Sequence, residues 1–138
     1  MDAQTRKRLE IPFADISVPA GFPSPATDYA EERINLNNFL IPHPESTFLV
    51  KCSGDSMINA FVPPQCLLLV DRSLTAQNGD MVLAHLQGEF TVKYLQRNDQ
   101  RCRLVAANRK YPDIDISPEM GLVIWGVVTR IITDPKAL

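Results

Sequence analysis

The sequence predicts a mainly β fold, a single compact β-sandwich or distorted barrel preceded by an extended N-terminal arm. Two observations predict it. From residue 46 onward, short apolar and β-branched runs alternate with turn signals at the spacing typical of all-β domains. Before residue 30, four prolines interrupt every possible helix or strand interior: Pro12, Pro19, Pro23 and Pro25. We therefore divide the chain into an arm, residues 1–30, and a β-rich domain, residues 31–138.

Six segments of the predicted domain have the composition and periodicity of strands: residues 47–52, 67–71, 81–86, 89–95, 102–106 and 122–132. Gln87-Gly88 is expected to form a tight hairpin between the third and fourth of them. A short helix or turn is expected over residues 36–40, and Pro42 prevents its continuation.

Size and charge restrict the class of protein. The chain has 138 residues, 45% of them hydrophobic, which suits one domain with one core. Its net charge of −2 does not indicate a nucleic-acid-binding surface, which would normally be basic. The absence of any long apolar run or signal peptide leads us to expect a cytoplasmic protein with no membrane association.

The segment Ser53-Gly54-Asp55-Ser56 interrupts two apolar runs and predicts a sharp corner. Gly54 has no Cβ and so permits a positive φ, while Asp55 and Ser56 are good N-cap residues for a helical turn. A serine on such a corner is exposed, and the backbone N–H groups beside it are the donors that an oxyanion needs. Most such turns are only turns, so the corner alone does not predict catalysis.

Lys93 is the second candidate residue. It shares one face of the strand 89–95 with Thr91, whereas Phe90, Val92 and Tyr94 share the other. A buried, neutral lysine can serve as the base that activates a serine. The alternative interpretation is an ordinary solvated lysine.

Ser56 in Gly-Asp-Ser-Met, followed some forty residues later by Thr-Val-Lys at 91–93, resembles the LexA/UmuD family of self-cleaving Ser-Lys peptidases. The resemblance includes Ala-Gly-Phe-Pro-Ser-Pro-Ala at 20–26 and extends over residues 17–132. It implies a domain of the LexA C-terminal type, with Ser56 as nucleophile and Lys93 as general base and acid. The backbone N–H groups of Asp55 and Ser56 would hold the oxyanion. The resemblance also implies cleavage between Ala20 and Gly21, two small residues in an extended context.

Further expectations follow from the resemblance. Self-cleavage would be stimulated by the RecA filament on single-stranded DNA during the SOS response. The processed chain, a homodimer, would be an accessory subunit of an error-prone translesion polymerase, with a UmuC-like catalytic partner. Residues 1–20 are too few for a helix-turn-helix, so we expect no direct DNA-binding domain.

Three alternatives remain open at this point. The chain could be a non-enzymatic β-domain that binds a protein partner, a peptidase that acts on unrelated proteins, or a Ser-His enzyme that uses His43 or His85. We expect no cofactor and no metal, because the three cysteines, Cys52, Cys66 and Cys102, lack zinc-ligand spacing and fit reduced thiols.

Two departures from the family pattern lie outside the serine and lysine motifs. Gln65-Cys66 replaces a common Gly-Asp, and Ala106-Ala107-Asn108 replaces Pro-x-Asn.

Overall fold

The computed structural model describes residues 10–14 and 31–137, which fall into two units that divide between Pro42 and His43. The predicted cleavage site, Ala20-Gly21, lies outside the described residues. Among the residues described, no helix is long and apolar enough to cross a membrane.

In the described residues of the first unit, a two-stranded antiparallel sheet is followed by a short helix. Strand β1 (Glu10–Ala14) pairs with β2 (Glu31–Asn35), and α2 (Leu36–Leu40) follows directly. The helix matches its predicted bounds, and the Asn35 side chain caps it by accepting the N–H groups of the second and third helical residues. The expectation that Pro12 excludes a strand was wrong. Both strands of a two-stranded sheet are edges, where a residue without an N–H is tolerated.

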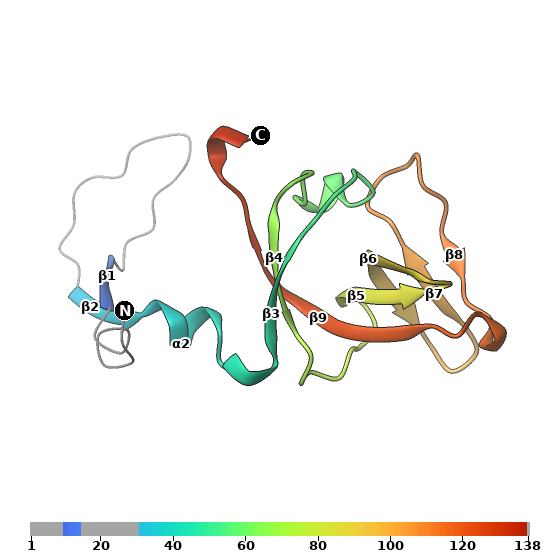
Figure 1. Ribbon diagram of the computed structural model, residues 1–138, viewed down its shortest axis with the longest axis horizontal. Helices are drawn as coiled ribbons and strands as arrows, with labels where there is room; N and C mark the ends of the chain where they lie inside the picture. Colours follow the sequence, from blue (N-terminus) through green and yellow to red (C-terminus); the bar gives the residue numbers. More distant parts are fainter. Residues whose placement is uncertain (1–9, 15–30, 138) are drawn as a thin grey trace. The chain divides into compact units, whose positions relative to one another are not determined.

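The second unit is a seven-stranded antiparallel sheet with the order β3-β4-β9-β5-β6-β7-β8 (Figure 1). Its strands are β3 (Thr47–Lys51), β4 (Leu67–Asp71), β5 (Met81–Leu86), β6 (Glu89–Arg97), β7 (Cys102–Val105), β8 (Ile114–Asp115) and β9 (Val123–Ile132). Four short 3₁₀ segments accompany them: Pro44–Ser46, Ile58–Ala60, Pro118–Met120 and Pro135–Ala137. The predicted mainly β fold is confirmed, and all six predicted strands are present. The two-residue β8 was not predicted.

The hairpin between β5 and β6 is the tight one that the sequence predicts. Leu86 pairs with Glu89, and the two residues between them, Gln87 and Gly88, have φ of 50° and 86°. Two consecutive positive φ values are the signature of a type I′ turn, whose twist suits an antiparallel pair. This turn fixes the register of β6, and therefore which face of that strand carries Lys93.

Strand β9 joins two halves of the sheet, because its first half pairs with β5 and its second half with β4 (Figure 1). Register shifts in both pairings allow the sheet to bend there. Gly126 lies at the change of partner, where a Cβ would stand 2.5 Å from a methyl of Val70. The unit has two core clusters, one around Leu95 and Leu104 and the other around Met57 and Leu68, and strands β5 and β9 contribute residues to both. The second cluster underlies the serine corner.

Candidate active site

The serine corner, residues 53–56, follows the end of β3, and the next residue, Met57, attaches it to the core. Gly54 has a φ of 80°, as predicted, and Met57 is only 2% exposed in the second core cluster. The 3₁₀ segment that follows has Met57 as its N-cap. The prediction that Asp55 or Ser56 would cap a helical turn was therefore wrong, because the corner directs these side chains to other partners.

A second segment, residues 106–111, braces the corner from the side. The side-chain amide of Asn108 donates to the carbonyl of Asp55 at 2.8 Å, and the N–H of Asn59 donates to the carbonyl of Ala107 at 2.8 Å. The hydroxyl of Tyr111 donates to the Asp55 carboxylate, and this bond raises the pKa of the tyrosine. Asp55 therefore holds the corner through both its backbone and its side chain.

Lys93 lies on β6 and is 8% exposed, one of two buried charged or polar residues in the described part of the chain. Its Nζ lies 2.9 Å from the Oγ of Ser56, 2.6 Å from the Oγ1 of Thr91 and 3.2 Å from the carbonyl oxygen of Val92. Burial lowers the pKa of Lys93, and the nearby Cys52 thiol opposes only part of this change. The structure thus brings Ser56 and Lys93 together, which the sequence pattern alone does not establish.

These three contacts suit a neutral amine as well as an ammonium ion. An ammonium group has three N–H donors, and the three oxygen atoms around Nζ accept them. A neutral amine has two N–H donors and one lone pair. Thr91 and Val92 provide two acceptors, which leaves the lone pair directed at the Ser56 hydroxyl. In that form Lys93 is placed to accept the serine proton.

Oxyanion donors and a pocket accompany this pair. Within the described residues, the backbone N–H groups of Asp55 and Ser56 have no hydrogen-bond acceptor. Ser56 opens into a pocket of about 220 Å³ lined by residues 50–53 and 90–92 and by Leu83. The site therefore combines a hydroxyl that lines the pocket, a buried amine bonded to that hydroxyl, and neighbouring N–H donors without an acceptor. These are the groups required for acyl transfer through a tetrahedral intermediate.

Comparison with known proteins identifies the family. The Peptidase S24-like family matches residues 12–129. The chain belongs to the Peptidase S24-like family. It is 41% identical over 130 residues to Protein MucA of Salmonella typhimurium, covering 93% of this chain and 88% of that protein. It is 43% identical over 132 residues to Protein ImpA of Shigella flexneri, covering 91% and 85%. It is also 37% identical over 127 residues to the LexA repressor of Carboxydothermus hydrogenoformans, covering 88% and 61%. The resemblance to the LexA/UmuD family is thereby confirmed.

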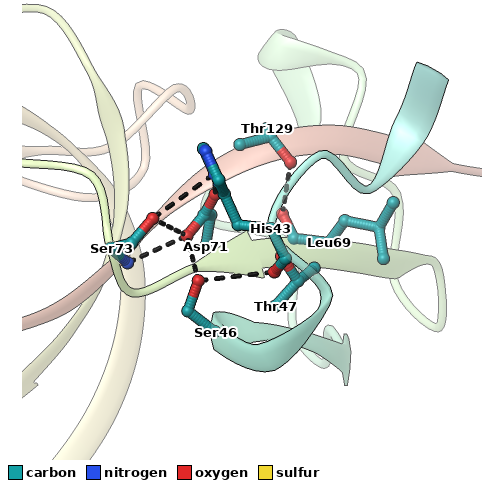
Figure 2. Close-up of polar contacts among 7 residues, drawn as sticks. All are labelled: His43, Ser46, Thr47, Leu69, Asp71, Ser73 and Thr129. Carbon is teal, nitrogen blue, oxygen red and sulfur yellow. Dashed lines mark hydrogen bonds and ion pairs between the residues drawn. The ribbon is translucent and has the colours of Figure 1, made fainter. Parts of the chain in front are cut away.

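Neither histidine of this S24-like chain has a described contact with Ser56. His43 Nδ1 lies 2.7 Å from Oδ2 of the buried Asp71, and 3.4 Å from the hydroxyl of Ser73 (Figure 2). In a Ser-His-Asp triad the carboxylate and the serine contact opposite ring nitrogens. Here both face Nδ1, so this cluster lacks the geometry of a triad. His85 stacks edge-on against Phe90.

The His43–Asp71 contact was not predicted, because the two residues are far apart in the sequence and no local pattern indicates such a pair. Burial raises the pKa of Asp71, but hydrogen bonds from His43, Ser73 and Ser46 outweigh it and hold that pKa well below its usual range (Figure 2). The second unit thus begins with a residue, His43, that is hydrogen-bonded to the last residue of β4. Across residues 10–14 and 31–137, no three His, Cys, Asp or Glu side chains gather as metal ligands would.

Proposed function

We propose that this chain is a serine endopeptidase that cleaves its own N-terminal arm, residues 1–30, at the Ala20-Gly21 bond. The domain of residues 31–138 would supply the catalytic groups. The observation that carries the proposal is the 2.9 Å separation between Ser56 Oγ and Lys93 Nζ in a buried setting. Membership of the Peptidase S24-like family supports peptidase chemistry.

The proposed reaction proceeds in two stages. Ser56 Oγ attacks the carbonyl carbon of Ala20 while neutral Lys93 accepts the hydroxyl proton, and the N–H groups of Asp55 and Ser56 stabilise the oxyanion. Lys93 then returns the proton to the nitrogen of Gly21 as the C–N bond breaks. Water hydrolyses the Ala20 ester and releases residues 1–20. Because the substrate is tethered, its effective concentration reaches about 10⁵ M or more when it is well oriented.

The resemblance to the LexA/UmuD family extends the proposal to partners. The RecA filament on single-stranded DNA would stimulate cleavage in the SOS response. The chain would act as a homodimer in the cytoplasm, and its processed form would join a UmuC-like subunit in error-prone translesion synthesis. Relatives of similar length, MucA and ImpA, support this extension by their identity over most of their length.

Intact-mass spectrometry tests the proposal directly. We expect the purified chain to lose residues 1–20 with RecA, an ATP analogue and single-stranded DNA, and slowly in alkali without them. Ser56→Ala and Lys93→Ala should both retain the full mass. Ser117→Ala and Lys136→Ala are matched controls outside the pocket and should cleave. An unchanged wild-type mass under both conditions would instead favour the non-enzymatic β-domain.

A further inference from the structure

Two of the three cysteines face each other across the ends of β3 and β4. The register of this pair runs from Thr47 opposite Asp71 to Lys51 opposite Leu67. Just beyond it, Cys52 is hydrogen-bonded through its backbone to both Gln65 and Cys66, as at a β-bulge. The N–H of Cys52 donates to the carbonyl of Cys66 at 2.8 Å, and each thiol affects the pKa of the other, as expected of neighbouring groups. The Cys52 thiol itself donates to the carbonyl of Ser53 at 3.7 Å. Opposed residues of antiparallel strands have Cα atoms about 4.5–5.5 Å apart, so two cysteines bonded through their backbones at the end of the ladder lie near the disulfide range of about 4.4–6.8 Å.

The two thiols differ in access. Cys66 is 4% exposed and belongs to the second core cluster, whereas Cys52 is half-buried and lines the pocket that holds Ser56. A small reagent that enters this pocket therefore meets Cys52 first. Cys66 is in reach of Cys52 but is shielded from solvent. The third cysteine, Cys102, packs against the other core cluster on β7.

We propose that Cys52 and Cys66 form a reversible disulfide that keeps the Ser56 pocket open under oxidising conditions. A low-molecular-weight disulfide such as oxidised glutathione is the oxidant. The Cys52 thiolate attacks one of its sulfur atoms, which forms a mixed disulfide and releases one glutathione thiolate. The Cys66 thiolate then attacks the Cys52 sulfur and releases the second. The protein loses two electrons and two protons, and the oxidant becomes two molecules of glutathione.

The attack of Cys66 on the mixed disulfide is the step that protects the pocket. A glutathione attached to Cys52 would occupy the pocket of about 220 Å³ in which Ser56 lies. Transfer of the bond to Cys66 removes that adduct and closes residues 53–65, which include Ser56, into a covalent loop. Burial raises the pKa of both thiols, so both steps should accelerate as the pH rises. The pairing of the thiols is independent of catalysis, whereas the protection of the pocket rests on the proposed function.

Thiol mapping of the full chain tests the pairing. After incubation with oxidised glutathione, alkylation and peptide mass analysis should find Cys52 linked to Cys66 and Cys102 free. Cys66→Ala should instead carry a stable glutathione adduct on Cys52, with Cys66→Val as a second variant should alanine weaken the core. Cys102→Ser is the matched control and should behave as the wild type. A persistent adduct on Cys52 of the wild type, a link to Cys102, or unreacted Cys52 and Cys66 would each overturn the proposal.

Self-cleavage measured on the same samples tests the protection. In oxidised glutathione, the wild type should cleave at close to its rate in reductant, while Cys66→Ala should lose most of its cleavage and recover it with dithiothreitol. If the disulfide-linked wild type cleaves as slowly as the glutathione adduct of Cys66→Ala, the proposed protective role is wrong. If nothing cleaves even in reductant, the proposed function fails, protection fails with it, and thiol mapping alone decides the pairing.

Discussion

The Oγ1 of Thr91 lies 2.6 Å from the Nζ of Lys93, closer than the Oγ of Ser56 at 2.9 Å. Both Thr91 and Lys93 lie on β6, two residues apart and therefore on one face of the strand. The threonine hydroxyl thus accepts a hydrogen bond from the amine of a lysine on the same strand. This contact makes Thr91 a positioning residue for Lys93.

Thr91→Val should therefore slow self-cleavage without unfolding the domain. The substitution preserves shape but removes one acceptor of Nζ, which is worth about 1 kcal/mol or roughly a five-fold fall in rate. Thr91→Ser should retain most of the rate because it keeps the hydroxyl. The measurement is the first-order loss of intact mass in alkali. Thr129→Val, which removes a hydroxyl bonded to Leu69 on β4, is the control. An equal loss in both valine variants would argue against a role in positioning.

The cleavage rate should rise with pH because neutral Lys93 is the proposed base. Burial lowers the pKa of Lys93, so the neutral fraction grows at a lower pH than it does for a free lysine. A rate profile should climb from neutral to alkaline pH and level off once the amine is neutral. A flat profile would rule out lysine as the titrating base, provided the domain stays folded by circular dichroism.

The lowered pKa of Lys93 also predicts that the stability of the domain depends on pH. Between the lowered pKa of the folded state and the ordinary pKa of the unfolded state, the unfolded chain binds more protons. The free energy of unfolding should therefore rise with pH across that interval. Lys93→Met, which removes the titrating group, should lack this rise in urea titrations. The same slope in both proteins would show that another group is responsible.

Asp71 should stabilise the domain through its hydrogen bonds with His43, Ser46 and Ser73. We expect Asp71→Ala to lower the free energy of unfolding by about 2–3 kcal/mol, since it leaves these groups without their charged acceptor. Because its folded pKa is depressed, its contribution is present above the unfolded pKa and is lost as pH falls toward the folded value. Asp71→Asn should accordingly unfold with a weaker dependence on acid pH than the wild type, and an unaltered acid dependence would contradict the assignment.

Gln65 has a φ of 73°, a left-handed conformation that costs a residue with a Cβ about 1–2 kcal/mol. Glycine adopts this conformation without that cost, so Gln65→Gly should stabilise the chain. Glycine also gives the unfolded chain more freedom, which costs about 0.4–1 kcal/mol, so a net gain near 0.5–1 kcal/mol is expected. Thermal unfolding measures it. Gln100→Gly, where φ is not positive, should destabilise, and a loss of stability at both positions would contradict the explanation.

Local signals in the sequence predicted most of the sheet. Alternating apolar residues and turn chemistry such as Gln87-Gly88 are local properties, so all six predicted strands formed at close to their predicted bounds. The misses depended on distant partners. Strand β1 forms around Pro12 because β2 pairs with it, and β8 exists only as the edge partner of β7. The His43–Asp71 and Cys52–Cys66 contacts likewise join segments whose separation no local pattern reveals.

The sequence by itself determined the types of residue available for catalysis, their order and the family, through the motifs around Ser56 and Lys93. Only the tertiary structure decided that the lysine is buried and that its amine lies within hydrogen-bond distance of the serine. The physical reason is that both properties depend on packing between segments distant in the chain. A strand lysine is solvated unless other elements cover it, and its pKa falls only where that cover excludes water.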